Sequence, residues 1–293
     1  MKRKVISILI CSLVVLNIAG CGTSSKTTSS DTSTTTEDTA KTTDDTSKNE
    51  DTKTENTPVK SEDEVLSKNE ADYKFNKDSG IILEYTGNAT AVEIPSTIGG
   101  VKVVEINKKA FMNKTQLERV VIPEGITRIG TQAFAQCSSL TSVNIPNSVE
   151  YIDSLAFSYC SSLKNITIPN NIKSFGTGTF TESAITSITI PNGITDIPPE
   201  TFERCFSLTS VSIPNSVTTI DKDAFSYCPI TSIQLPEKLV NINQYAFSNC
   251  SKLTTLNLPD SVKRVESGAF QGCPNLTVHA SNKIIADVRS AMK

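Results

Sequence analysis

The fold of this chain is set by a stretch that recurs along it, and residues 140–163 show it in full: LTSVNIPNSVEYIDSLAFSYCSSL. Its opening part has apolar residues in the pattern L-x-x-V-x-I, which predicts a short strand with one buried face. Pro146 ends this strand, because proline has no backbone N–H to donate to a neighbouring strand. The closing part, A-F-x-x-C-x-x-L, has the spacing of one face of a short helical turn. The stretch therefore predicts one strand and one helical turn per repeat.

Two markers repeat in phase with this stretch along the rest of the chain. A proline follows Ile or Leu at spacings of 28, 23, 23, 22, 23, 22 and 23 residues, at Pro95, Pro123, Pro146, Pro169, Pro191, Pro214, Pro236 and Pro259. A phenylalanine recurs at spacings of 23, 23, 23, 22, 23, 22 and 23, at Phe111, Phe134, Phe157, Phe180, Phe202, Phe225, Phe247 and Phe270. Since no single turn can bury its own apolar face, successive turns must stack. We therefore predict a solenoid with the phenylalanines pointing inward.

These residues resemble the BspA-like leucine-rich-repeat family of bacterial surface proteins. The motif I-P-x-x-V-x-x-I-x-x-x-A-F-x-x-C-x-x-L-x-x-V recurs through residues 117–278. The resemblance implies an α/β-type repeat solenoid, a right-handed stack of turns of ~22–23 residues, each with a short strand and a short helical turn. Further residues resemble that family's N-terminal β-meander cap: Tyr73, Phe75, Gly80, Tyr85, Gly87, Gly99 and Gly100. Residues 281–293 are predicted to form a C-terminal cap helix, with Ile285, Val288 and Met292 on one face.

The start of the chain has the features of a secretory signal. Basic residues at positions 2–4 precede an apolar run from Val5 to Leu16, which is too short for a membrane span. The run leads into the sequence IAGC, ending at Cys21, which resembles the lipobox of bacterial lipoproteins. The resemblance implies a diacylglyceryl group on Cys21 that anchors the chain to the cell membrane. The alternative is an ordinary signal peptide with a cysteine placed by chance.

The segment after Cys21 has the composition of a disordered tether. Residues 22–60 contain 14 Thr and 6 Ser, so 20 of 39 positions carry a hydroxyl group and few apolar side chains remain to form a core. A flexible coil of ~40 residues has a root-mean-square reach of about 35 Å. The predicted organisation is a signal peptide at 1–20, a lipidated tether at 21–60, an N-terminal cap at 61–94, a repeat array at 95–280 and a cap helix at 281–293.

The eight cysteines separate by position. Cys11 lies in the signal and Cys21 is the predicted lipid site, whereas the other six each stand three residues after a repeat phenylalanine: Cys137, Cys160, Cys205, Cys228, Cys250 and Cys273. A zinc site or disulfide framework needs cysteines that converge, but these six form a column with one residue per turn. We therefore expect small buried thiols in a fixed slot. Disulfides between adjacent turns, such as Cys137 to Cys160, remain an alternative, because stacking could bring the Cα atoms within range.

The concave surface is where we expect a partner to bind, since solenoids present extended surfaces built from repeated strands. Its outward positions form two columns of mostly small, neutral, polar side chains. The first column is Arg119, Ser142, Asn165, Ser187, Ser210, Ser232 and Thr255, and the second is Val121, Asn144, Thr167, Thr189, Ser212, Gln234 and Asn257. A solvated sheet face without a ligand is the alternative interpretation.

Charge and motifs argue against nucleic-acid binding and catalysis. The formal net charge of −3 leaves no basic surface for nucleic acid. The chain has a single histidine, His279, and no nucleotide, zinc-protease or serine-hydrolase motif, so we expect no catalytic residue, metal or cofactor. The family resemblance implies a membrane-anchored, surface-exposed binding or adhesion module for a protein or glycan partner. The alternative is a structural spacer or self-association protein of the cell envelope.

Overall fold

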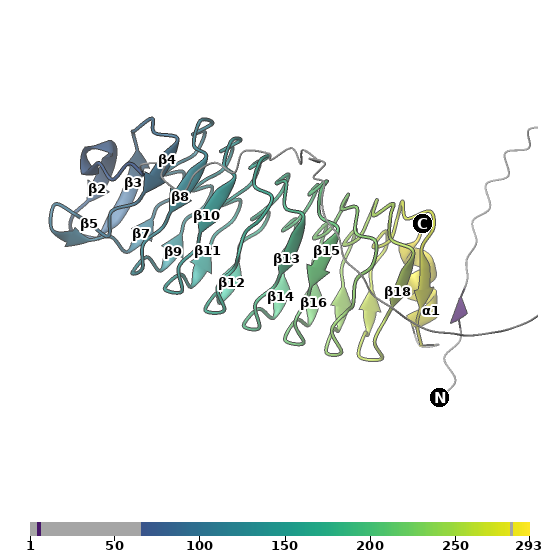
Figure 1. Cartoon of the computed structure of the whole chain (residues 1–293). Helices are drawn as coiled ribbons and strands as arrows, with labels where there is room; N and C mark the ends of the chain where they lie inside the picture. Colours follow the sequence, from purple (N-terminus) through teal and green to yellow (C-terminus); the bar gives the residue numbers. More distant parts are fainter. Residues whose placement is uncertain (1–4, 7–65, 282–283) are drawn as a thin grey trace, which may run out of the picture. The chain divides into compact units, whose positions relative to one another are not determined.

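The structure is a computed structural model that describes residues 5–6, 66–281 and 284–293, all within one compact unit. The expected lipid site at Cys21, the tether at 21–60 and most of the predicted signal at 1–20 lie outside the described residues. The described chain forms a β-solenoid of about nine turns of about 23 residues each. Figure 1 shows these turns following one another along the array.

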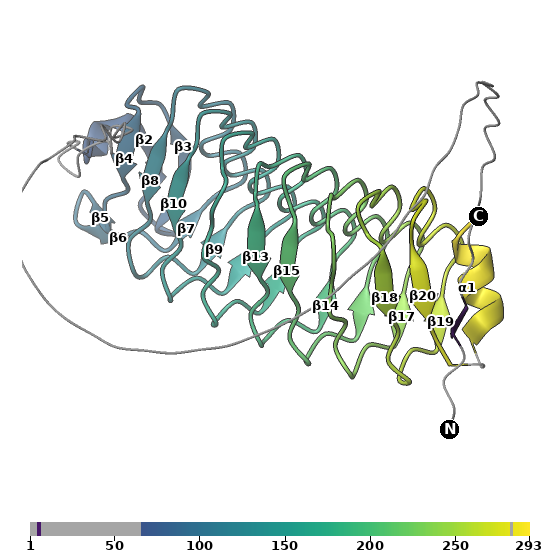
Figure 2. The ribbon, with the colours of Figure 1, turned by 45° about the vertical axis from the view of Figure 1, so that its right-hand side comes forward.

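Two ladders of short strands run along the array (Figures 1 and 2). Ladder A consists of β4 (Ala91–Glu93), β8 (Arg119–Val121), β10 (Ser142–Asn144), β13 (Ser187–Thr189), β15 (Ser210–Ser212), β18 (Thr255–Asn257) and β20 (Thr277–His279). Ladder B consists of β3 (Ile81–Tyr85), β7 (Glu105–Ile106), β9 (Arg128–Ile129), β11 (Tyr151–Ile152), β12 (Ser174–Phe175), β14 (Asp196–Ile197), β16 (Thr219–Ile220), β17 (Asn241–Ile242) and β19 (Arg264–Val265). Paired strands are parallel and offset by one repeat, as Val120 is with Val143.

The alternation of apolar and polar residues sets which side chains of ladder A point inward. In β10, Val143 is buried while Ser142 and Asn144 are exposed, and β13, β15 and β18 repeat this pattern. Pro146 follows the strand, and its carbonyl accepts a hydrogen bond from the N–H of Val149 at 3.1 Å. This tight turn leads the chain into ladder B. The predicted short strand followed by a proline is therefore confirmed.

The expected helical turn is wrong, and with it the α/β description of each repeat. The segment around each repeat phenylalanine is a run of turns with no helix. Its N–H groups bond to the next turn of the solenoid: Phe134 donates to the carbonyl of Ala156 at 2.8 Å, and Gln136 to that of Ser158 at 2.8 Å. These donors are therefore not available for bonds within a helix.

Left-handed residues explain why this segment is not helical. The residues two before and two after each repeat phenylalanine have positive φ in all eight repeats, and only Gly178, Gly268 and Gly272 among them are glycines. At Gln132 and Gln136, for example, φ is 57° and 62°. A residue in this conformation ends an α-helix, and it costs a non-glycine residue about 1–2 kcal/mol. The apolar spacing typical of a helix therefore belongs here to a turn that needs two left-handed residues.

The inter-turn bonds of the phenylalanines form a third ladder, which we call the turn ladder. Each repeat phenylalanine, from Phe111 to Phe270, donates its N–H to a carbonyl of the next turn or of the C-terminal helix at 2.7–2.9 Å. This series has no interruption, whereas ladder A is divided among three sheets and ladder B between two. The turn ladder is therefore the connection that all eight repeats share.

The core contains a column of stacked aromatic rings. The eight repeat phenylalanines are at most 1% exposed, and consecutive rings have centroids 4.8–6.1 Å apart. Tyr85 extends the column, with its ring centroid 4.9 Å from that of Phe111. Aliphatic residues of both strand ladders pack around this column in one continuous cluster.

The array begins with two antiparallel hairpins. After a short 3-10 helix, η1 (Glu70–Asp72), β2 (Tyr73–Asn76) pairs with β3, and β5 (Thr97–Ile98) pairs with β6 (Val101–Lys102). However, β3 and β4 already pair in parallel with the β7 and β8 strands of the repeats. Both ladders therefore begin within the segment expected to be a cap, 61–94.

The array ends in a short helix. α1 (Ile285–Ala291) is the one α-helix of the described residues and is shorter than the helix predicted over 281–293 (Figure 2). Its Val288 and Ala291 are buried in the core, and Met292 packs against the core while partly exposed. β1 (Val5–Ile6) pairs antiparallel with β20.

Candidate binding face

The exposed residues of the ladder A turns define a surface that we call the polar face. It comprises Ser142, Asn144, Asn165, Thr167, Ser187, Thr189, Ser210, Ser212, Ser232, Gln234, Thr255 and Asn257, all of which are exposed. The sequence-predicted residues at its start, Arg119 and Val121, are half-buried. The structure thus places both predicted columns side by side along one ladder.

Ladder A is interrupted twice within the polar face. Residues 165–167 and 232–234 occupy strand positions in their turns, but neither segment is a strand, and neither pairs with a neighbouring strand. In the described residues, the segment before 165–167 still bonds to the next turn, since Thr186 donates its N–H to the carbonyl of Lys164 at 3.0 Å. The backbone hydrogen bonds between these turns therefore stop where the strand would begin.

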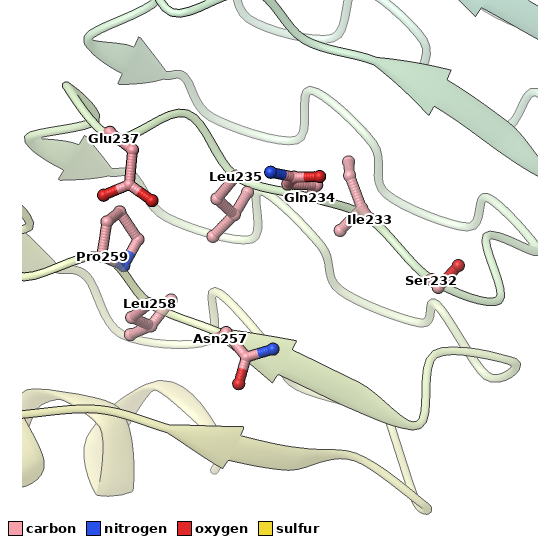
Figure 3. A pocket seen from close by; sticks show the side chains of 8 residues that line it. All are labelled: Ser232, Ile233, Gln234, Leu235, Glu237, Asn257, Leu258 and Pro259. Carbon is pink, nitrogen blue, oxygen red and sulfur yellow. The ribbon is translucent and has the colours of Figure 1, made fainter. Parts of the chain in front are cut away.

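One hollow, which we call the first hollow, lies at the interruption formed by residues 232–234 and has a volume of about 380 Å³. Figure 3 shows the side chains that line it, which come from two successive turns: Ser232, Ile233, Gln234, Leu235 and Glu237 from one, and Asn257, Leu258 and Pro259 from the next. Its polar groups are a hydroxyl, two amides and one carboxylate. Sequence reasoning did not single out Glu237, although its position directly after the repeat proline places it at the end of the polar face.

The other hollow, which we call the second hollow, lies beside the interruption formed by residues 165–167 and has a volume of about 480 Å³. It is lined by three successive turns: Ile166, Thr167 and Ile168, then Ser187, Ile188 and Thr189, then Ser210 and Ser212. Its polar lining consists entirely of hydroxyl groups and main chain. Both hollows therefore combine polar side chains, all of them neutral except Glu237, with apolar side chains, as ligand sites commonly do.

Asn144 has a structural role that its position in the column did not reveal. Its side-chain Oδ1 accepts a hydrogen bond from the N–H of Ile122 at 2.7 Å, and its Nδ2 donates to the carbonyl of Ile122 at 3.1 Å. The amide thus continues the strand pairing between two turns. Among the predicted site residues, Asn144 is therefore less suited to a ligand than Asn165, Gln234 or Asn257.

The six repeat cysteines are free and buried. The predicted column is present, and each thiol donates to the carbonyl of the phenylalanine one turn earlier, as Cys160 Sγ does to Phe134 at 3.3 Å. The alternative of a disulfide between Cys137 and Cys160 is therefore wrong in this structure. Burial raises the pKa of Cys137 and of Cys205 to about 12, so these thiols stay protonated and unreactive.

The described part of the chain contains no cluster of side chains arranged as a metal site would be. His279 is half-buried in β20, where its carbonyl accepts the N–H of Leu258 at 2.8 Å. Within the described residues, no three side chains of His, Cys, Asp or Glu converge as metal ligands would, and no helix is long and apolar enough to cross a membrane.

The fold defines a bacterial leucine-rich-repeat solenoid, and comparison with known proteins specifies the type. The model of the BspA type leucine rich repeat region matches residues 82–208 and 195–290, with six copies. The match covers more than half of the chain, which therefore belongs to the BspA-type leucine-rich-repeat family. A comparison with curated proteins finds no match.

Solved structures with the same fold support this assignment. A leucine-rich-repeat protein of T. pallidum is 28% identical, with a TM-score of 0.56, and the match covers 75% of this chain and 92% of that one. A leucine-rich-repeat protein of Bacteroides ovatus is 31% identical, with a TM-score of 0.58 and coverage of 73% and 63%. A protein of Faecalibacterium prausnitzii, described as a leucine-rich cell surface protein, is 28% identical, with a TM-score of 0.59 and coverage of 73% and 69%.

Proposed function

We propose that this protein is a non-catalytic binding or adhesion module that is exposed at the bacterial surface and recognises a protein or glycan partner through the polar face. The observation that carries the proposal is the pair of hollows. They lie where ladder A is interrupted, and together they are lined by predicted columns of hydroxyl and amide side chains. At the interruptions, main-chain groups without a hydrogen bond to a neighbouring turn lie beside apolar side chains, and a ligand could bond to the former while it contacts the latter.

The proposed location rests on the start of the sequence and on the family. The IAGC sequence ending at Cys21 supports a diacylglyceryl anchor, and residues 22–60 supply a polar spacer between membrane and array. The F. prausnitzii relative is described as a cell surface protein. If the anchor is correct, Cys21→Ala moves the protein from the membrane fraction to the soluble fraction. Retention of the variant in the membrane fraction would place the anchor elsewhere.

A pull-down with the full-length chain tests the binding function. Bait protein is compared with the triple variant Asn165→Ala, Gln234→Ala, Asn257→Ala, whose side chains make no hydrogen bond within the described residues. We expect a partner that the wild type retains and the triple variant releases, with equal thermal unfolding temperatures for the two proteins. Equal retention by both would exclude the polar face as the binding surface.

The second candidate function is a structural spacer or self-association protein of the envelope. Its support is the regular stacking of turns, which needs no ligand to explain it, and the open edge that a solenoid end can offer to another copy. Sedimentation of the full-length chain distinguishes the two functions, since a monomer over a wide concentration range favours binding over self-association.

We further propose that α1 covers the C-terminal end of the core, because its Val288 and Ala291 are buried there.

A further inference from the structure

The two interrupted segments of ladder A carry main-chain groups with no partner among the described residues. Within residues 165–167 and 232–234, no main-chain N–H or carbonyl forms a hydrogen bond to either neighbouring turn. Both isoleucines, Ile166 and Ile233, belong to the core and are 9% exposed, whereas the residues on either side of each are exposed, so these segments lie at the boundary between core and solvent. Such groups must bond to water or to a ligand, because leaving them unsatisfied costs about 1–3 kcal/mol each.

The side chains around these groups are suited to hydroxylated, uncharged ligands. Thr167, Thr189 and Ser212 contribute hydroxyls that both donate and accept, while Gln234 and Asn257 contribute amides that do the same. A sugar ring carries hydroxyls of this kind around its edge and C–H groups on its faces. The hollows match both parts, because the isoleucine, leucine and proline side chains of their linings lie beside the polar groups.

Charge and aromatic content argue against other ligand classes. The one charged residue that lines either hollow is Glu237, and its carboxylate would repel an anionic ligand. A single carboxylate is too little charge to select a cationic ligand. Protein interfaces depend on Trp, Tyr and Arg at their centres, and neither lining contains any of the three.

The two hollows adjoin one another along the array. β15 lines the second hollow with Ser210 and Ser212, and the next turn begins the first hollow at Ser232. From Asn165 to Asn257 the polar face crosses four inter-turn steps, which at about 4.8 Å each is a length of about 19 Å. This is long enough for several linked sugars but too long for one.

We propose that the polar face binds a neutral glycan chain that runs across both hollows and bonds to the open main chain of residues 165–167 and 232–234. This inference rests on the proposed binding function and names the class of its ligand. Binding needs no covalent step, so the bound chain leaves unchanged.

A glycan array followed by titration tests this proposal. The full-length chain is applied to neutral oligosaccharides of glucose, mannose, galactose and N-acetylglucosamine, each as disaccharide and hexasaccharide, and to anionic heparin and galacturonate hexasaccharides. We expect a neutral hexasaccharide to bind more tightly than its disaccharide, because only the longer chain reaches both hollows. No neutral probe binding with a Kd below about 1 mM, or tighter binding of the anionic probes, would overturn the proposal.

Variants in each hollow show whether one chain occupies both. Gln234→Ala in the first hollow and Thr189→Ala in the second should each weaken hexasaccharide binding about 3- to 10-fold, the loss of one hydrogen bond. Ser142→Ala is the matched control, since Ser142 is exposed on the same face but lines neither hollow. Equal affinities of the Ser142 and Gln234 variants would overturn the proposal.

The pull-down separates failure of this inference from failure of the proposed function. A protein partner that is lost in the triple variant, with no glycan bound, would refute the glycan ligand and leave the binding function standing. If the wild type binds neither a protein partner nor a glycan, both the binding function and the glycan ligand are refuted. Glycan binding that the triple variant abolishes supports both.

Discussion

Phe134 and Phe157 lie in successive turns with their ring centroids 5.3 Å apart and their planes within 2° of parallel. The same two residues are joined indirectly by the turn ladder, because Phe134 donates its N–H to Ala156, the neighbour of Phe157. The ring stack and the backbone ladder therefore have the same register. A change to one ring affects the contact of both neighbouring turns.

The first prediction concerns this stack. Phe157→Ala removes a fully buried ring that contacts rings on both sides, and should lower the free energy of unfolding by about 3–5 kcal/mol through the cavity it leaves. Urea unfolding followed by circular dichroism measures it. Phe206→Ala is the control, because Phe206 is 64% exposed and its loss should change stability by less than about 0.5 kcal/mol. Similar losses in the two variants would contradict the assignment of Phe157 to the core.

The second prediction concerns the left-handed positions. Gln136 is exposed, and its φ is 62°. Gln136→Gly should raise the free energy of unfolding by about 0.5–1 kcal/mol, because glycine adopts this backbone without strain. Gln136→Val should lower it by at least that amount. Ser142→Gly, at a residue with ordinary strand backbone, serves as the reference and should be destabilising; a stabilising effect there would show that glycine acts through something other than φ.

The third prediction concerns the buried thiols and pH. Burial raises the pKa of Cys205 to about 12, whereas in the unfolded chain a thiol ionises near about 8.5. Above pH 8.5 the unfolded chain therefore binds fewer protons than the folded one, so the free energy of unfolding falls as pH rises towards 12; below 8.5 this group has no effect. Each such thiol contributes a slope of up to about 1.4 kcal/mol per pH unit.

Comparison of two slopes isolates the thiol from other groups that titrate in this range. Wild type and Cys205→Ala are unfolded with urea at pH values between 8 and 10.5. The variant should be less stable at pH 8 but lose stability more slowly as the pH rises. Parallel curves would mean that Cys205 ionises equally in both states.

The fourth prediction concerns α1. Val288 is 1% exposed, and Ala291 accepts the N–H of Phe270 at 2.9 Å as the next repeat turn would. Val288→Asp places a carboxylate in this buried contact and should detach the helix from the array. The Phe270 amide should then lose its protection from hydrogen exchange, while the Phe134 amide keeps its protection. Arg289→Ala, on the exposed side of the helix, is the control. Persisting protection of the Phe270 amide in Val288→Asp would refute the end-covering role of α1.

The periodicity of the sequence was sufficient to predict the solenoid and which side chains point inward. Repeated apolar residues at L-x-x-V-x-I can be buried only if every turn presents the same face, so Val143 and Phe157 could be placed from spacing alone. The proline after each strand likewise marked the end of pairing. These features depend on the apolar pattern within each turn and on its repetition from turn to turn, and both can be read from a single sequence.

The helical turn and the hollows could not be predicted in the same way. A step of three residues between Phe157 and Cys160 is common to a helix and to the observed turn, and polar residues such as Gln132 and Gln136 give no sign of positive φ. The interruptions of ladder A depend on whether the main chains of neighbouring turns come within hydrogen-bond distance. Residues 165–167 follow the same pattern as paired strands, so only the structure distinguishes them.

The uninterrupted turn ladder makes molecular length adjustable in whole steps. Each turn provides a carbonyl that accepts the Phe N–H of the previous turn, and its own Phe N–H donates to the following turn. Every boundary between two turns therefore has the same hydrogen bond. A gene duplication or deletion of 22 or 23 codons would leave every boundary matched, whereas a change of a few codons within a turn would not. The length of the array can therefore change by whole turns, with the inter-turn bond of each turn retained.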